Sequence, residues 1–263
     1  MKHLIAILAL LAAPVSAHEF WIEPADGQVP EGAPLVAQIR VGEMLEGANY
    51  SYLPKNFRRF EIALGDRLIP VEGRMGDRPA LNMAVEGEGL ATVIHVTRDY
   101  DLTYDRWEKF ANFTQHKDFT WAQARHVERG LSRDKVTERY IRYGKSLIAV
   151  GDGQGADRAF GLEVEIVALA NPYTDDLSGG FPVQVMYQGA ALADAQVEVF
   201  DKAPDGAVEQ RLYRTDADGR AMIDVTPGHF HLVDHVELRE VDEGPDGPAW
   251  ESVWASLTFE VPE

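Results

Sequence analysis

The sequence predicts a mainly β protein of two β-sandwich domains, with a helical insertion in or after the first. Short runs of aliphatic and β-branched residues recur along the chain, and glycine or proline separates most of them. One segment instead spaces its aromatic residues as a helix does, and one polar, glycine-rich stretch divides the chain. These patterns predict residues 18–152 as the first domain and residues 158–263 as the second.

The first 17 residues have the pattern of a cleaved signal peptide. Lys2 and His3 precede an apolar run over residues 4–13, and Val15-Ser16-Ala17 is a small-residue cleavage motif. The run is shorter than the roughly 20 apolar residues that cross a bilayer, and no later stretch reaches that length. We therefore expect export to the periplasm and a mature chain that begins at His18 and has no transmembrane segment.

Five runs predict the strands of the first domain: residues 34–41, 60–64, 67–71, 90–97 and 146–150. Gly65 and Asp66 predict a turn that joins the second and third runs into a hairpin. The run at residues 90–97 is rich in β-branched residues, which suit a pleated surface, and it contains His95.

Helical spacing begins after the fourth of these runs. Trp107, Phe110 and Phe113 recur three residues apart with charged residues among them, which predicts an amphipathic helix. Residues 122–130 and 135–145 continue the helical bias, so we expect the insertion to cover about residues 104–145.

The polar, turn-rich stretch at residues 151–157 (GDGQGAD) predicts a domain boundary. Beyond it, six runs predict strands at residues 162–167, 182–187, 195–200, 221–225, 229–233 and 254–261. Their spacing is typical of a small immunoglobulin-like sandwich.

Composition restricts the chemistry. The chain has no cysteine, so a metal site would use histidine, carboxylate, methionine or the terminal amine. The formal charge of −18 would become −19 once Lys2 is removed, and an acidic surface repels phosphate backbones. We therefore do not expect nucleic acid as a partner. The sequence contains neither a nucleophile elbow nor a phosphate-binding loop, and it predicts no catalytic residues.

His18 would carry both an imidazole and the free α-amine of the mature chain. The two nitrogens could chelate one metal ion, and a second histidine would complete a T-shaped copper site. The α-amine has a reference pKa of about 8, so its deprotonation at neutral pH takes little free energy. The alternative is that His18 only follows the cleavage site.

Three further histidines lie in seven residues, at positions 229, 231 and 235. On a strand, residues at even separation share a face, so His229 and His231 form a candidate pair for Zn, Ni, Co or Cu. His235 would share that face if the strand stays regular, and Asp234 would point away. The alternative is a solvated polar face on an exposed strand.

The remaining histidines are less distinctive. His95 lies inside a β-branched strand, where a single semi-buried histidine is the usual role. His116 and His126 lie ten residues apart, about 80° around a helix axis, which is not the spacing of a helical metal clip. Each could still contribute a ligand from a separate helix.

The chain resembles the DUF4198 family, exported bacterial proteins also described as nickel-uptake substrate-specific or NikM-like periplasmic components. The resemblance begins with AHEFWIEP at residues 17–24. Other segments that fit the family pattern are RVGE (40–43), WEKF (107–110), HK (116–117), RYIRYGKSLIAVG (139–151), LEVEIVALANP (162–172), TDADGRA (215–221) and WASLTFEV (254–261).

The resemblance implies two β-sandwich domains, a periplasmic location and a role in handling transition metals. It marks His18 as the leading ligand and His235 as a position like those of the family. His229 and His231 stand where family members usually carry apolar or aromatic residues.

We therefore expect a soluble periplasmic protein that captures or delivers a divalent metal, Ni, Co, Cu or Zn, for uptake. His18 would chelate the ion, and His235, His95 or His116 would complete the coordination, with His229 and His231 as further candidates. The expected partners are the metal ion and a membrane metal transporter or a TonB-dependent receptor.

Two other functions stay open. The first is a copper His-brace oxidase that uses the mature N-terminal histidine. The second is a non-catalytic carbohydrate- or receptor-binding module in which Trp21, Trp107, Trp121 and the tyrosines stack on sugars, although Trp and Phe at helical spacing are more often core residues.

Overall fold

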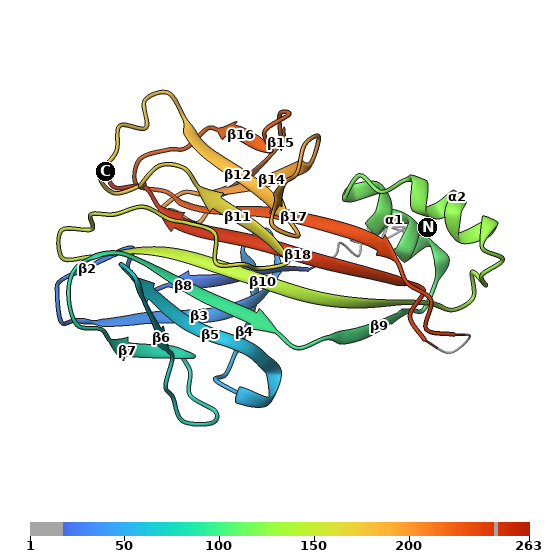
Figure 1. The fold of residues 1–263 in the computed structure, drawn as a ribbon, viewed down its shortest axis with the longest axis horizontal. Coiled ribbons are helices and arrows are strands. Elements are labelled where there is room, and N and C mark those ends of the chain that lie inside the picture. Colours follow the sequence, from blue (N-terminus) through green and yellow to red (C-terminus); the bar gives the residue numbers. More distant parts are fainter. Residues whose placement is uncertain (1–17, 245–246) are drawn as a thin grey trace, which may run out of the picture.

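The computed structural model describes residues 18–244 and 247–263, and the predicted signal peptide lies outside these residues. Within them the chain forms three β-sheets, two α-helices and a short 3₁₀ turn at Pro54–Asn56 (Figure 1). The prediction of a mainly β fold with packed sheets and a helical insertion is confirmed. None of the helices in the described ranges is long and apolar enough to span a membrane.

A ten-stranded sheet, here called the central sheet, runs through the molecule. Its main path is, in spatial order, β15 (Val208–Arg214), β14 (Gln196–Lys202), β17 (Phe230–Glu240), β18 (Trp250–Glu260), β10 (Val136–Val150), β8 (Gly89–Thr97), β5 (Phe57–Leu64) and β6 (Arg67–Pro70). Two more strands, β2 (Gln28–Val29) and β9 (Tyr100–Tyr104), pair with β10.

Two smaller sheets complete the β layers. The N-terminal sheet contains β1 (Glu19–Pro24), β3 (Pro34–Glu43), β4 (Glu46–Tyr50) and β7 (Leu81–Ala84). The C-terminal sheet contains β11 (Val164–Ala168), β12 (Phe181–Tyr187), β13 (Ala190–Ala191) and β16 (Arg220–Ile223).

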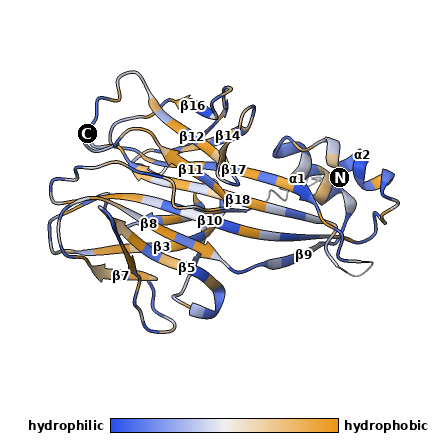
Figure 2. Ribbon diagram, in the orientation of Figure 1, coloured by the Kyte–Doolittle hydropathy of each residue, from blue (hydrophilic) through white to orange (hydrophobic). Residues whose placement is uncertain are grey.

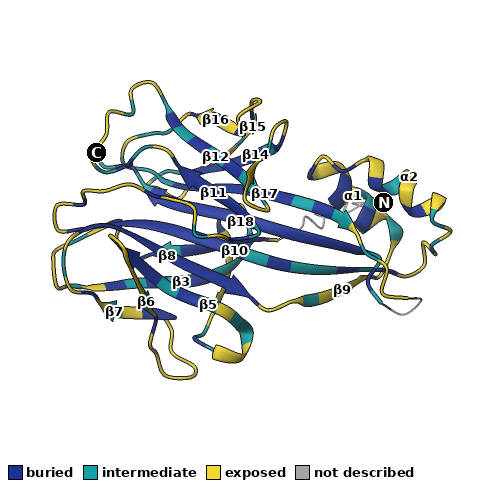
Figure 3. Cartoon of the chain, in the orientation of Figure 1, coloured by how far each residue is buried: buried dark blue, intermediate teal, exposed yellow. Residues whose placement is uncertain are grey.

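The two smaller sheets cover opposite faces of the central sheet. On β8, Ile94 packs in the hydrophobic cluster shared with the C-terminal sheet, while Val93 packs in the cluster shared with the N-terminal sheet. Successive strand residues point to opposite faces, so the two clusters lie on opposite sides. Every residue of β8 is therefore buried, as Figure 3 shows, which explains why apolar and β-branched residues dominate its sequence.

The helices cover the part of the central sheet that the N-terminal sheet leaves open. Helix α1 (Trp107–His116) buries Phe110 and Phe113, and helix α2 (Trp121–Glu128) buries Ala122. These side chains pack on Trp250 and on other residues of β17 and β18. Figure 2 shows that both helices contain polar and apolar residues, as expected for amphipathic helices on a sheet.

The prediction that residues 135–145 are helical is wrong. Residues 136–145 belong to β10, which pairs with β18 in parallel and with β9 and β8 in antiparallel orientation. Charged residues three and four apart imitate a helix there, but the same segment is rich in threonine, tyrosine, isoleucine and valine, which favour strands. Pairing on both edges overrides the local pattern.

A buried lysine joins the central and C-terminal sheets. Lys145 of β10 is 1% exposed, and its Nζ lies 2.7 Å from Asp157 Oδ2 and 3.3 Å from Glu165 Oε1. Asp157 belongs to the stretch predicted as a domain boundary, and Glu165 belongs to β11. The chain that leaves the central sheet is therefore fastened to it by a buried ion pair.

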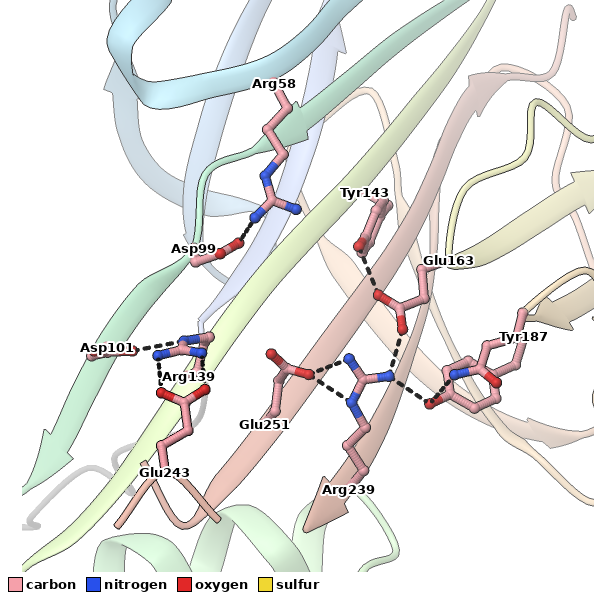
Figure 4. Close-up of polar contacts among 11 residues, drawn as sticks. Arg58, Asp99, Asp101, Arg139, Tyr143, Glu163, Tyr187, Arg239, Glu243 and Glu251 are labelled. Atoms are coloured by element: carbon pink, nitrogen blue, oxygen red, sulfur yellow. Dashed lines mark hydrogen bonds and ion pairs between the residues drawn. The ribbon is translucent and has the colours of Figure 1, made fainter. Parts of the chain in front are cut away.

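A second polar network connects the same layers farther along the sheet. Figure 4 shows Arg239 of β17 between Glu251 of β18 and Glu163, which directly precedes β11. Arg239 also donates to the Tyr187 hydroxyl at the end of β12, and Tyr143 of β10 donates to Glu163. Strands far apart in the sequence thus share one set of hydrogen bonds.

Substitution Lys145→Met tests the first of these connections. It should lower the free energy of unfolding by about 3–5 kcal/mol, because two buried carboxylates lose their cation. Urea denaturation measures the change. Arg211→Gln, which removes an exposed pair with Glu209, is the control and should change stability by less than about 1 kcal/mol. Equal effects in the two variants would contradict the role of Lys145.

Candidate functional site

Strand β1 holds Glu19, the residue that follows His18, in place. In the antiparallel pairing of β1 with β3, Glu19 lies opposite Gly42. One further step of that register brings His18 beside Glu43, and His18 Nε2 lies 3.9 Å from Glu43 Oε1. The His18 side chain is 57% exposed, whereas Glu19 is 2% exposed. The chain thus passes from exposed to buried within one residue.

Glu19 takes part in a buried cluster around Lys117, which we call the Lys117 cluster. Lys117 ends helix α1, and its Nζ lies 3.0 Å from Asp234 Oδ2, 3.0 Å from Glu198 Oε2 and 3.8 Å from Glu19 Oε1. His116 Nε2 lies 3.4 Å from Glu198 Oε2 at the more exposed side. Four segments, β1, the end of α1, β14 and β17, therefore meet at one ammonium group.

Three carboxyl groups around one lysine cannot all stay charged at low cost. Burial raises the pKa of Glu19 to about 8, although the Lys117 charge opposes the shift. Burial also raises the pKa of Asp234. Burial acts on Glu198 in the same way, but the hydrogen bond with His116 and the Lys117 charge outweigh it and lower that pKa. At neutral pH, Glu19 is therefore mainly protonated.

His229 and His231 converge on Asp201 of β14. His229 Nδ1 lies 2.5 Å from Asp201 Oδ1, and His231 Nε2 lies 3.7 Å from the same oxygen. Thr226 donates its hydroxyl to the second carboxylate oxygen of Asp201. The two imidazoles approach the same carboxylate oxygen, although His229 lies just before β17 (Phe230–Glu240) and not on it as predicted. His231 is completely buried and stacks on Phe259.

His235 and His95 lie elsewhere. His235 is 3% exposed, and its Nδ1 lies 2.7 Å from the backbone oxygen of Gln196. His95 is 4% exposed among aromatic rings that include Phe20, and burial lowers its pKa to about 3. Its imidazole is therefore neutral at any physiological pH.

Across residues 18–244 and 247–263, no three histidine or acidic side chains are grouped as metal ligands. Of the six predicted ligands, only His229 and His231 contact a common side chain. His18, His116 and His235 are linked indirectly, because the residue beside each of them belongs to the Lys117 cluster. His126 has a structural role, since Trp250 Nε1 donates to its Nδ1 over 3.0 Å.

The tryptophans proposed for sugar stacking have different surroundings. Trp21 is fully buried against Leu45 and Phe200, so its ring has no surface for a ligand. Trp107 is partly buried beneath Arg133, while Trp121 is 46% exposed on α2. The three rings therefore do not form one open platform.

A cavity of about 370 Å³ opens beside His18. It lies among β9, β10, β18 and helix α1, and its lining residues are His18, Leu102, Thr103, Tyr104, Asp105, Lys109, Phe113, Glu138, Tyr140, Arg142 and Trp254. Arg142 donates from Nη2 to the His18 backbone oxygen over 3.2 Å. Arg142 thus both lines the cavity and contacts the backbone of His18.

Glu138 is a buried acid in this cavity. It is 2% exposed, and it accepts hydrogen bonds from the Tyr104 hydroxyl over 2.5 Å and from the Ser252 hydroxyl. Burial raises the pKa of Glu138 to about 7, while the two hydrogen bonds oppose the shift. The cavity therefore gains or loses one negative charge close to neutral pH.

The sequence of the chain matches the model of a known protein family. The model described as "Domain of unknown function (DUF4198)" matches residues 15–236, most of the chain. The chain belongs to the DUF4198 family. The family predicted from the N-terminal motif is therefore confirmed.

No curated protein matches this DUF4198 protein. Among solved structures, it is similar to the D0-D1 domain of intimin, with 12% identity, a TM-score of 0.23, and coverage of 91% of this chain and 97% of that one. It is also similar to a tetra-tandem repeat in the extending region of a large adhesion protein, with 10% identity, a TM-score of 0.21, and coverage of 93% and 50%. Neither similarity carries a functional argument.

Sequence reasoning found the histidines but missed the groups around them. Lys117 directly follows His116, and Asp234 directly precedes His235. Glu138 lies in a segment that was predicted to be helical. Charged residues are rarely buried, so sequence alone assigns them to the surface. The one available signal was the position of Lys117 and Asp234 directly beside His116 and His235.

Substitution Lys117→Met tests whether the cluster fixes β1. We expect a loss of about 3–5 kcal/mol in the free energy of unfolding, because Asp234 and Glu198 lose their buried cation. Amide hydrogen exchange in residues 19–24 should become faster in the native state. Lys109→Met removes an exposed pair with Asp105 and serves as the control. Unchanged exchange in β1 would contradict the proposed anchoring.

The raised pKa of Glu138 predicts how stability depends on pH. The folded protein holds this proton at a pKa of about 7, against an ordinary value of 4.5. Its stabilising contribution is therefore complete below pH 4.5 and is lost as pH rises through 7. Relative to wild type, Glu138→Gln should gain about 3 kcal/mol between pH 4.5 and pH 8. Urea denaturation across this range measures the gain, and parallel profiles would disprove it.

Proposed function

We propose that this DUF4198 protein is exported and binds a divalent transition metal, Ni, Co, Cu or Zn, through His18 at its mature N-terminus. The proposal rests on cleavage after Ala17, which would free the α-amine. The observation that carries it is the fixed position of His18 beside Glu43 at the start of β1. Most exported proteins begin with loosely ordered residues, whereas here the strand starts one residue after the terminus.

The donors available at this position suit a transition metal. The α-amine and imidazole of His18 supply two nitrogens, and Glu43 supplies a carboxylate oxygen 3.9 Å from the imidazole. Imidazole nitrogen favours Zn, Cu, Ni and Co over the harder Mg and Ca ions. Three protein donors leave coordination positions for water or for the ligands of a recipient, which suits a protein that must release its cargo.

Two anchors preorganise the site. The Lys117 cluster holds Glu19, and Arg142 donates to the carbonyl oxygen of His18. The backbone on the carboxyl side of the proposed chelate is therefore held before the metal arrives. Preorganisation reduces the entropy lost on binding, so it raises affinity without adding a ligand.

The overall charge is consistent with a cation as cargo. The formal charge of −18 creates a field that raises the local concentration of cations, although it does not select among them. Delivery would occur to a membrane metal transporter or a TonB-dependent receptor. Because the metal lies at an exposed terminus, a recipient could approach it without unfolding the protein.

The proposal is tested by titrating Ni²⁺ into metal-free protein that begins at His18 and into protein with one added N-terminal glycine. The extended protein and His18→Ala should each bind at least about tenfold more weakly, and Glu43→Gln should show a smaller loss. Isothermal titration calorimetry measures the affinities.

His229→Gln is the matched control for this titration, because His229 pairs with Asp201 and not with the N-terminal segment. It should leave the affinity unchanged. Equal affinity of the processed and extended proteins would overturn chelation by the amine. A loss confined to His229→Gln would transfer the site to Asp201 and its two histidines.

A further inference from the structure

The cavity beside His18 contains a cation, Arg142, for which the described residues provide no acidic partner within 4.0 Å. Arg142 lies on β10 in the central sheet, and its Nε is buried without a hydrogen-bond partner. Within residues 18–244 and 247–263, no carboxylate lies within 4.0 Å of its guanidinium nitrogens. Within the same described ranges, the one hydrogen bond of the guanidinium is the donation from Nη2 to His18 O.

Other buried or partly buried cations in the described chain behave differently. Lys117 and Lys145 each contact at least two carboxylates. Arg139 and Arg239 each pair with two acidic side chains (Figure 4). Burying a guanidinium without an anion is unfavourable, so the free donors of Arg142 mark a place where an anion from solution would be stabilised.

The other residues that line the cavity indicate which chemical group is attached to the anion. Arg142 lies over the Tyr140 ring, 4.6 Å from its centroid, and 6.0 Å from the Trp254 ring centroid. Tyr104 and Phe113 add further aromatic walls, and Leu102 adds an aliphatic one. A volume of about 370 Å³ is in the range of small-molecule sites, which combine mainly apolar walls with a few polar groups.

The negative charge inside the cavity favours a monoanionic carboxylate over a phosphate with a second negative charge. Asp105 is paired with Lys109 in the cavity wall, but Glu138 also lines the cavity, so a second negative charge on the ligand would be repelled by its carboxylate. A monoanionic carboxylate matches the planar fork of one guanidinium, which can donate two parallel hydrogen bonds to it. The aromatic walls favour a planar ring on the same molecule.

We propose that this cavity binds a small aromatic or heteroaromatic monocarboxylate, with the carboxylate on Arg142 and the ring among Tyr104, Phe113, Tyr140 and Trp254. The inference does not require metal at His18, so it goes beyond the proposed function. It assigns the cavity to an organic ligand whose anionic end lies next to the N-terminal residue.

The test uses 2-naphthoate as the probe and its neutral amide, 2-naphthamide, as the isostere, in buffer freed of metal with a chelating resin. Calorimetry should show saturable one-to-one binding of naphthoate and at least tenfold weaker binding of the amide. Arg142→Gln should abolish this preference for the anion, whereas Arg139→Gln, on the same strand but outside the cavity, should retain it.

Two further measurements control for misfolding of the variant and for the position of the bound ligand. Arg142→Lys keeps the charge but loses the fork, and it should bind naphthoate with intermediate affinity even if Arg142→Gln is unstable. Nuclear Overhauser effects from the naphthyl protons to Trp254 and Phe113 would place the ring in the cavity. Equal binding of naphthoate and naphthamide, or an unchanged preference in Arg142→Lys and Arg142→Gln, would overturn the inference.

Metal binding by the processed N-terminus is measured without naphthoate, so each result stands independently of the other. Inorganic phosphate serves as a further probe. Displacement of naphthoate by equimolar phosphate would contradict the selection for a monocarboxylate.

Discussion

The ammonium group of Lys117 is the point on which the candidate site depends. It lies at the end of α1 and contacts carboxyl groups from β1, β14 and β17, all of them buried. A buried cation needs such partners, and the partners need the cation, so none of these segments can shift alone. The consequence is that helix α1 and the first strand are both held to the central sheet. The exposed residue at the start of that strand, His18, is therefore held as well.

Local patterns predicted much of the fold, and non-local pairing explains the rest. The prediction of a strand at residues 90–97 matches β8, and the run at 162–167 largely matches β11. Both have the alternating or β-branched sequences of strands. The long strand β10 was missed in part because its charged residues imitate a helix. Its parallel partner β18 lies about a hundred residues away, and no local signal encodes that pairing.

The candidate site was predictable to a lesser extent. His18 follows from the cleavage motif and the absence of cysteine, and the segment at residues 17–24 together with the later family-like segments identified the family. Glu43 became a neighbour of His18 only through the register of β1 and β3. Lys117, Glu138 and Arg142 owe their importance to burial, which residue type alone predicts wrongly for charged side chains. The histidines were visible because imidazole has few common roles, whereas buried charges resemble ordinary surface residues.

Location of the bound metal tests the central claim most directly. Crystals of protein that begins at His18, grown with one equivalent of Ni²⁺, would give an anomalous difference map at the nickel absorption edge. We expect one dominant peak within coordination distance of the His18 imidazole and α-amine, on the side of Glu43. A dominant peak at Asp201, His229 and His231, or at no position near the N-terminus, would contradict the claim.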